Sequence, residues 1–206
     1  MMPSITLLAK VVFLATTSLA AQNFSTAECG QTKGCLFQPP DCVPFENCVY
    51  ALSYSATNSG EVVLELLGQV SAPNNTYVAV GFSKDQMMGQ DTVTACASYN
   101  NSPFEGHLTY NPSRTNLNVP LDEESQNMIL RTIASDVDNN TVYCKLVQKI
   151  EPPSNVLADF VAPLNQEYFI LMASGPTRTG SNPGLLKHNK TPFISSEMIN
   201  LLQFQS

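Results

Sequence analysis

The sequence predicts an all-β fold, an antiparallel β-sandwich behind a disulfide-tied N-terminal lead. Short apolar runs recur between clusters of turn-forming residues, at roughly the 8–12-residue spacing typical of β-sandwiches. Apolar and polar residues also alternate within the runs. In the run that begins at Thr141, Val142, Cys144 and Leu146 share one face and Lys145 lies on the other. The chain is long enough to bury a full core in one domain.

The first 20 residues have the pattern of a secretory signal peptide. Apolar runs flank Lys10, and Ser18-Leu19-Ala20 supplies a cleavage site of the small-x-small type. Cleavage after Ala20 would leave 186 residues. No later stretch approaches the ~20 consecutive apolar residues that a membrane-spanning helix needs. We therefore expect a secreted, extracellular protein with no stable membrane insertion.

Residues 21–48 form a lead rich in Cys, Pro and Gly, which we expect to be held by disulfides rather than by packing. The chain has six cysteines, and an even number suits an oxidising compartment. We expect Cys96 and Cys144, which stand apart in the body of the chain, to pair with each other. The other four would then pair among themselves within the lead: Cys29, Cys35, Cys42 and Cys48. Residues 49–206 are predicted to form the sandwich.

Eight strands are predicted in the sandwich: Cys48–Ser55, Glu61–Val70, Thr76–Ser83, Thr92–Tyr99, His107–Tyr110, Met128–Ala134, Thr141–Ile150 and Tyr168–Ala173. The strand that begins at Thr76 is apolar on both faces, as expected for a central strand. The strongest helix candidate is the short segment Leu157–Phe160. The pattern is therefore typical of a domain dominated by strands.

Potential glycosylation sites and the net charge both bear on the class of partner. Five Asn-x-Ser/Thr sequons agree with export, and we expect glycans at Asn23, Asn74, Asn100, Asn139 and Asn189. The formal net charge of −7 becomes −8 when Lys10 leaves with the signal peptide. Nucleic acid requires clustered Lys and Arg side chains, and anionic membranes favour basic surfaces. Both are therefore excluded as expected partners.

Met88 and His188 are the residues whose chemistry stands out. A methionine thioether and a histidine imidazole are the axial ligands of electron-transfer haems. The two residues are 100 positions apart, so only a folded domain can bring them together. Methionines fill cores far more often than they bind metals. Without further context, Met88 would be read as a packing residue and His188 as a surface residue.

Several segments resemble the DOMON family, most closely its ferric-chelate-reductase type. The main segment comprises Tyr77–Ser83, Asp85, Met88-Gly89, Asp91, Val93 and Cys96. The lead motif Cys29-Gly30-x-x-Lys33-x-Cys35 is similar to the beginning of that subgroup. The later segments Tyr168–Gly175, Leu186–His188 and Pro192–Ser195 are similar to its closing strand and its histidine segment. The resemblance spans about residues 29–200.

This resemblance implies an immunoglobulin-like sandwich that, in the cytochrome branch of the family, holds a b-type haem at one end. The ligand methionine of the family falls on Met88, and its ligand histidine falls on His188. Gly89 would let the backbone approach a porphyrin closely. His188 could face the pocket while a glycan on Asn189 points away, because neighbours in an extended chain point to opposite faces.

Other residues near these motifs have simpler expected roles. We expect Met87 to pack in the protein, and Asp85 and Asp91 to cap turns and loops. His107 is expected to be structural or exposed. Three aromatic residues on or near strands are candidates to line a haem pocket, although such residues belong to the core by default: Phe82, Phe169 and Phe193.

The leading interpretation is a secreted protein that binds haem b through Met88 and His188 and acts in one-electron transfer. In the family, such domains are often joined to a transmembrane b-type cytochrome module. That module is absent from this sequence, so the expected redox partner is a separate membrane b-type cytochrome or a small molecule. Neither a Gly-x-Ser-x-Gly elbow nor a Gly-rich phosphate loop is present. We therefore expect an electron carrier or binding module rather than an enzyme.

Two alternatives remain open at this point. Some relatives in the family lack the haem ligands, and this chain could likewise be a non-haem extracellular module that recognises a sugar, a small molecule or a partner protein. A third interpretation is a Cu(I) site formed by Met87, Met88 and His188, since soft thioethers favour that ion. The copper site requires both methionines to face the same way.

Overall fold

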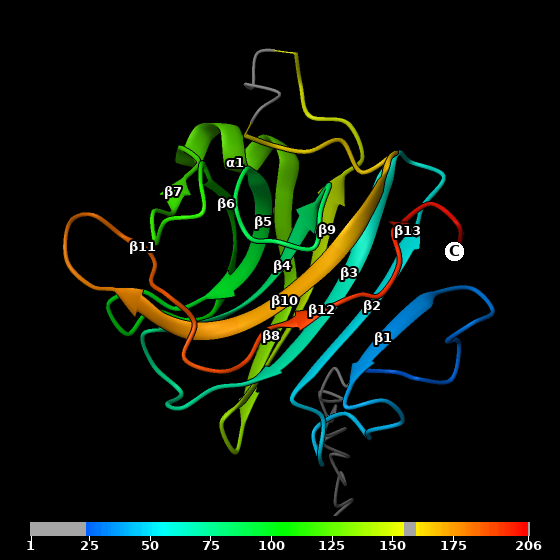
Figure 1. Cartoon of the computed structure of the whole chain (residues 1–206), viewed down its shortest axis with the longest axis horizontal. Coiled ribbons are helices and arrows are strands. Elements are labelled where there is room, and N and C mark those ends of the chain that lie inside the picture. Colours follow the sequence, from blue (N-terminus) through cyan, green and yellow to red (C-terminus); the bar gives the residue numbers. More distant parts are fainter. Residues whose placement is uncertain (1–23, 155–159, 206) are drawn as a thin grey trace, which may run out of the picture.

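The computed structural model describes residues 24–154 and 160–205, which form two packed antiparallel sheets (Figure 1). The first sheet has the strand order β1-β2-β3-β9-β8. Its strands are β1 (Gly34–Gln38), β2 (Tyr50–Ala56), β3 (Glu61–Gln69), β8 (Leu130–Asp138) and β9 (Thr141–Lys149). The predicted all-β sandwich is confirmed.

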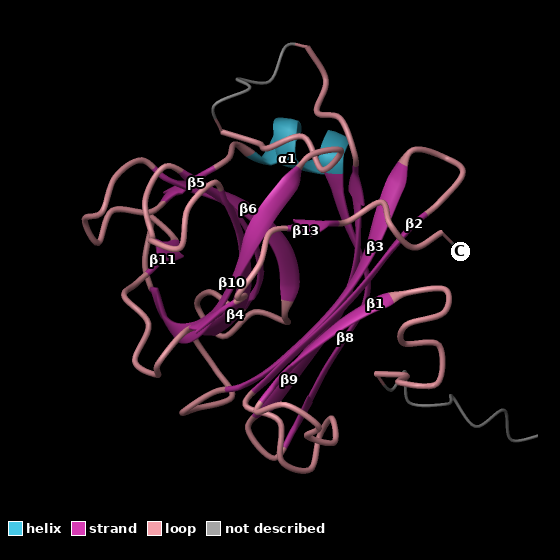
Figure 2. Cartoon of the chain, turned by 45° about the vertical axis from the view of Figure 1, so that its right-hand side comes forward, coloured by secondary structure: helices cyan, strands magenta, loops and turns pink. Residues whose placement is uncertain are grey.

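The second sheet has the strand order β11-β10-β4-β5-β6-β7, and two further short strands pair with β10. Its path comprises β4 (Thr76–Ser83), β5 (Asp91–Ala97), β6 (Glu105–Asn111), β7 (Val119–Pro120), β10 (Glu167–Arg178) and β11 (Gly184–Leu185). The additional strands are β12 (Phe193–Ile194) and β13 (Ile199–Asn200). Figure 2 shows the one helix of the described residues, α1 (Glu123–Ile129), at one end of the sandwich.

The core lies between the two sheets because every second side chain of each central strand points inward. From β4 these are Val78, Val80 and Phe82, and they belong to the same buried cluster as residues of β2, β3, β9 and β10. A disulfide between Cys96 of β5 and Cys144 of β9 joins the two sheets. This pairing is the one predicted from the sequence.

The N-terminal lead is more ordered than predicted. Its disulfides are Cys29–Cys35 and Cys42–Cys48, as expected, but the prediction that it lacks packed structure is wrong. The lead contributes β1, which pairs along its whole length with β2, and it buries Phe24. Cysteines, prolines and glycines obscured this strand because they interrupt the alternation on which strand prediction depends.

Most predicted strands agree with the observed strands to within a few residues, and β4 has the predicted bounds. The prediction of a strand from Met128 is wrong in its first two residues, which belong to α1. This helix begins after Asp122, whose side chain accepts a hydrogen bond from the backbone N–H of Ser125. The signal peptide, Asn23 and most of the predicted helix Leu157–Phe160 lie outside the described residues.

Candidate functional site

A cavity lies on the outer face of the second sheet, the face turned away from the core. Its floor comes from alternate residues of the central strands, including Tyr77, Ala79 and Gly81 of β4 and Ala173 of β10. These side chains point outward because the intervening residues of β4 point into the core. Small residues on this face leave space above the sheet, and the cavity has a volume of about 80 Å³.

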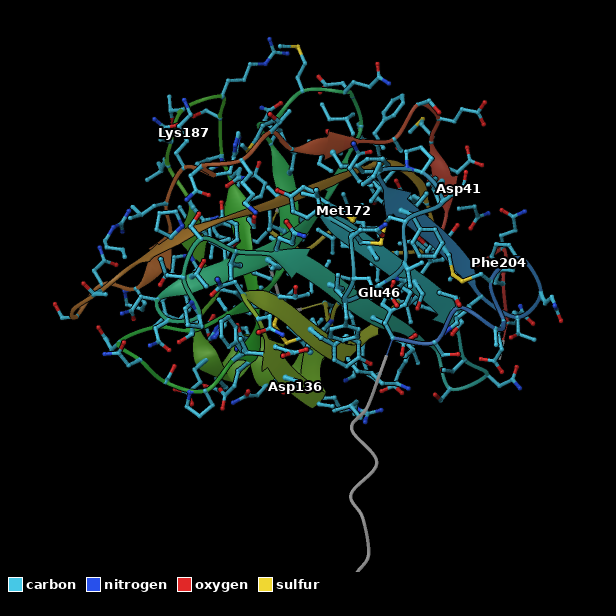
Figure 3. The ribbon with its side chains drawn as sticks, turned by 90° about the horizontal axis from the view of Figure 1, so that it is seen from below. Asp41, Glu46, Asp136, Met172, Lys187 and Phe204 are labelled. Atoms are coloured by element: carbon cyan, nitrogen blue, oxygen red, sulfur yellow. A yellow bond between two sulfur atoms is a disulfide. The ribbon has the colours of Figure 1, made fainter. Side chains whose placement is uncertain are left out.

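Met88 and His188 both line this cavity. Met88 lies in the loop between β4 and β5, and His188 lies in the segment that follows β11. Figure 3 labels the neighbouring Lys187, on the far side of the molecule from Asp41 of the lead. The fold therefore brings the two predicted ligand residues to one place, and it does so on the sheet face opposite to the lead.

The loop that carries Met88 is held by carboxylates at both ends. The Oδ1 atom of Asp85 accepts a hydrogen bond from the backbone N–H of Met87 at 2.7 Å. The Oδ2 atom of Asp91 accepts one from the N–H of Gly89 at 2.6 Å. The predicted capping roles of both aspartates are confirmed, and these bonds fix the path of the backbone on either side of Met88.

Asp91 is itself part of the cavity wall and is only 2% exposed. Burial raises the pKa of its carboxyl, and the nearby charge of Asp85 raises it further. Hydrogen bonds from Ser83 and from the backbone of Gly89 act in the opposite direction on this pKa. The cavity face thus contains a buried acid whose ionised form is disfavoured.

The segment that carries His188 runs beside β10. The backbone N–H of Leu186 donates to the carbonyl of Pro176 at 3.0 Å, and the N–H of Asn189 donates to the carbonyl of Ser174 at 3.4 Å. The hydroxyl of Tyr77 donates to the carbonyl of Leu186 at 2.9 Å. These contacts hold the segment on both sides of His188.

The imidazole of His188 is oriented by one hydrogen bond. Its Nδ1 atom lies 2.9 Å from the carbonyl oxygen of Lys190. A carbonyl only accepts, so Nδ1 carries a proton, and in the neutral imidazole Nε2 then keeps its lone pair. Among the described residues, Nε2 has no hydrogen-bond partner. Metal-bound imidazoles commonly have this arrangement, in which one nitrogen donates to a carbonyl and the other binds the metal.

The donor set fits a haem, whereas the present volume does not. A neutral thioether and an imidazole with a free Nε2 are suitable axial ligands. However, small-molecule sites usually enclose about 300–1,000 Å³, and this cavity has about 80 Å³. Two side chains at its edge are exposed, Leu117 at 51% and Leu186 at 37%. A flat macrocycle can enter only when such edge residues move outward.

Several other predicted residues do not line the cavity. Phe82 points into the core, where its ring lies 5.9 Å from that of Tyr168, because it alternates with the outward-facing Gly81. Phe169 and Phe193 are also not part of the lining. Phe82 and Phe169 lie on strands that the sequence predicted, but the sequence could not assign the face to which each one points.

Gly89, Met87 and His107 lie outside the cavity lining. Gly89 has a φ of +132°, and a Cβ there would lie 2.8 Å from the backbone nitrogen of Arg114, so this glycine permits a close approach of two loops. The expectation that Met87 packs is wrong, because it is 49% exposed and lies outside the cavity lining. A Cu(I) site with both methionines is therefore not supported.

His107 is structural, as expected. Its ring makes an edge contact with Tyr99 at 4.9 Å, and burial lowers its pKa.

Four of the predicted glycosylation sites lie within the described residues, and all four are exposed: Asn74, Asn100, Asn139 and Asn189. The Asn189 side chain donates to the hydroxyl of Ser71 at 3.1 Å, while the neighbouring His188 lines the cavity. The two side chains therefore diverge as expected for an extended segment. Glycosylation itself stays a prediction.

Sequence reasoning missed the residues from the end of β6 to the start of β7 that complete the cavity. Asn111, Thr115, Asn116, Leu117 and Asn118 all belong to its lining. Nothing in the local sequence distinguishes them from ordinary loop residues. Among the residues that the structure describes, no cluster of three or more His, Cys, Asp or Glu side chains could hold a metal ion.

The model of the DOMON domain matches residues 46–175 of this chain. The chain belongs to the DOMON family. It is 29% identical to the DOMON domain-containing protein FRRS1L of Homo sapiens over 180 residues, which cover 86% of this chain and 55% of that protein. It is also 29% identical to ferric-chelate reductase 1 of Mus musculus, over 86% of this chain and 27% of the relative.

Human ferric-chelate reductase 1 is 27% identical over 84% of this chain and 27% of its own length. The chain thus spans between about a quarter and about half of these curated relatives. The helix α1 in the described part of this DOMON domain is not long and apolar enough to span a membrane.

Proposed function

We propose that this DOMON domain is a secreted haem b protein that uses Met88 and His188 as axial ligands and carries single electrons. The observation that carries the proposal is that both side chains line one cavity although they are 100 residues apart. The three disulfides among the described residues suit the oxidising environment outside the cell. The names of relatives that are ferric-chelate reductases support a redox role.

Each ligand residue has a distinct part in this proposal. When bound, the haem iron would supply a one-electron couple whose potential is raised by a thioether ligand. The Lys190 carbonyl holds the proton of His188 on Nδ1 and so directs Nε2 to act as a ligand. The capped loop between Asp85 and Asp91 holds Met88 in the lining of the same cavity. The redox partner would be a membrane b-type cytochrome or a small molecule.

The test is an absorption spectrum of the mature protein, oxidised and reduced, after expression with haemin. We expect a Soret band and sharp reduced α and β bands. Met88→Ala and His188→Ala should both lose the six-coordinate spectrum. Met87→Ala is the matched control, since this neighbouring methionine lies outside the cavity lining, and it should keep the spectrum. A colourless but well-folded wild-type protein would contradict the proposal.

Lys187 offers a second test of the same site. It is the only lysine or arginine among the described residues that line the cavity. Because haem propionates are anionic, Lys187→Gln should weaken haem binding several-fold, and the difference should diminish at high salt. The exposed Lys149, on the other sheet, provides the control Lys149→Gln. Equal affinities of the two variants would exclude a contribution from Lys187.

A non-haem interaction module is the second candidate, and the small volume of the cavity favours it. In that case the ligand would be a small molecule, a sugar or a partner protein bound at the same face. The protein would then stay colourless with haemin, and Met88→Ala and His188→Ala would leave its absorption unchanged.

A further inference from the structure

Asn118 connects two parts of the second sheet that are far apart in the strand order. Its side-chain Nδ2 donates to the hydroxyl of Thr109 at 2.8 Å and to Oδ1 of Asn111 at 3.0 Å, both on β6. Its Oδ1 accepts from the backbone N–H of Leu185, on β11, at 3.1 Å. The backbone N–H of Leu185 can only donate, which fixes the orientation of the amide. Asn118 is buried and has three of its four bonding positions filled.

The segments that carry Met88 and His188 are both hydrogen-bonded to the residues that Asn118 connects. On one side, the backbone N–H of Gln90, two residues after Met88, donates to the carbonyl of Asn111 at 2.6 Å. On the other side, Leu185 is three residues before His188. A continuous series of hydrogen bonds therefore runs from the Met88 loop through Asn111 and Asn118 to the His188 segment.

No other hydrogen bond among the described residues directly joins the segment 184–190 to the Met88 loop or to residues 111–118. The alternative route passes along the sheet through β10, β4, β5 and β6. Figure 1 shows β11 and β7 close together although they lie at opposite ends of the strand order. The second sheet is thus curved around the cavity, and the hydrogen bonds of Asn118 join β6 to β11 across it.

We infer that Asn118 is a positioning residue, which sets the separation between the Met88 and His188 side chains by joining the segments that carry them. It does so through Asn111 on the Met88 side and through the backbone of Leu185 on the His188 side. The joining of the segments is a property of the polypeptide alone. Its effect on coordination rests on the proposed haem function.

The first experiment measures backbone hydrogen exchange in the haem-free protein. Asn118→Ala should accelerate exchange at the amide of Leu185, which loses its acceptor, and also at the amide of Gln90, which Asn118 does not contact. Asn111→Ala should accelerate exchange at Gln90 and leave Leu185 protected. Asn165→Ala is the control, since it removes an exposed side-chain bond to Glu151 and should change neither amide.

The second experiment uses the haem-loaded protein. Removing a buried amide with three hydrogen bonds should increase the rate of haem loss about tenfold or more. We also expect Asn118→Ala to convert part of the six-coordinate spectrum to a five-coordinate one. Asn111→Ala should do the same to a smaller extent, and Asn165→Ala should leave both the rate and the spectrum unchanged. A stable fold is verified for each variant by its thermal unfolding transition.

The two experiments separate this inference from the proposed function. If the wild-type protein takes up no haem but Asn118→Ala accelerates exchange at both amides, the link between the segments stands and the haem function fails. If only the Leu185 amide is affected and the haem spectrum is intact, Asn118 is a local anchor and the inference is overturned.

Discussion

The two outer faces of the sandwich are built in opposite ways. The outer face of the first sheet is covered by the lead, whose Phe24, Cys42 and Cys48 pack against residues of β2, β3 and β9. The outer face of the second sheet carries small residues such as Ala79 and Gly81 and holds the cavity. Figure 1 shows the lead and β11 on opposite sides of the molecule. One face is therefore closed by the chain itself, and the other is left available to a ligand.

The hydrogen bonding of the polar groups also differs between the two faces. On the lead side, the carboxylate of Glu65 accepts from Lys33 and Ser53, each at 2.7 Å, and from Tyr143 at 3.0 Å. On the cavity side, Nε2 of His188 has no partner among the described residues. Buried polar groups are normally satisfied within the protein. The satisfied cluster therefore indicates a structural role. His188 is only half-buried, so its Nε2 atom is accessible to solvent or to a ligand.

The largest expected loss of stability comes from removing the disulfide that joins the two sheets. Cys96 and Cys144 close a loop of sequence separation 48, whereas Cys42 and Cys48 are separated by 6. From loop-closure entropy, Cys96→Ala/Cys144→Ala should lower the free energy of unfolding by about 4 kcal/mol. Cys42→Ala/Cys48→Ala should lower it by about 2 kcal/mol. Urea unfolding measures both, and equal losses would contradict the expected difference.

The second largest loss of unfolding free energy is expected from breaking the buried ion pair between Lys33 and Glu65. Glu65→Gln leaves the Lys33 ammonium without its counter-charge in a buried position, which should cost about 3 kcal/mol of unfolding free energy. The control is Glu61→Gln, because Arg131, which pairs with Glu61, is 56% exposed. That change should cost less than about 1 kcal/mol. Similar urea midpoints for the two variants would show that the lead is not held by this pair.

Two glycines on the outer face of the second sheet provide a matched comparison. A Cβ at Gly175 would lie 2.8 Å from the backbone Cα of His188, whereas at Gly81 its nearest neighbour would be 3.6 Å away. Gly175→Ala should therefore push the His188 segment outward and cost about 1–3 kcal/mol. Gly81→Ala should change stability by less than about 1 kcal/mol. Thermal unfolding of both variants tests this, and a larger loss for Gly81→Ala would refute it.

The smallest expected effect is a difference in pH dependence between the two faces. Burial raises the pKa of Glu65, but hydrogen bonds from Lys33, Ser53 and Tyr143 and the charge of Lys33 outweigh it, so the net pKa is lowered. Its stabilisation is present above the unfolded value of about 4.3 and is lost as the pH falls through the folded value.

Asp91 behaves in the opposite way because its pKa is raised. Its contribution is present below the unfolded value of about 3.9 and is lost as the pH rises through the folded value. Glu65→Gln should reduce the loss of unfolding free energy as the pH falls below about 4.3. Asp91→Asn should reduce the loss of unfolding free energy as the pH rises above about 3.9. Unfolding free energies measured from pH 3 upward decide this. Parallel curves for wild type and both variants would contradict the assignment.

Much of the fold could be predicted from alternation. The pattern of Val142, Cys144 and Leu146 identified the inner face of β9, and the apolar run from Thr76 identified β4 as a central strand. The strands β7, β11, β12 and β13 have only two residues each. Two residues are too few to show alternation, so a local pattern cannot reveal these strands. The start of the helix α1 does carry a local sequence signal, since Asp122 caps it and two glutamates follow in its first turn.

The candidate site was predicted in part. The family pattern and the chemistry of Met88 and His188 selected two residues that the fold brings to one cavity. Phe82 was assigned to the pocket because its strand was recognised without knowledge of which face borders the cavity. Asn118 could not be found in this way, because its role depends on the curvature of the sheet. Curvature is a property of the assembled strands and not of the residues around Asn118.

The strand β10 has a consequence for the order in which the domain is completed during synthesis. It pairs with β4, β11, β12 and β13, and it begins only at Glu167. While the chain is being synthesised from its N-terminus, the edge of β4 stays open until this strand arrives. An open edge is prone to pair with other chains. The late arrival of β10 thus leaves the nascent domain vulnerable to aggregation until this strand has been delivered.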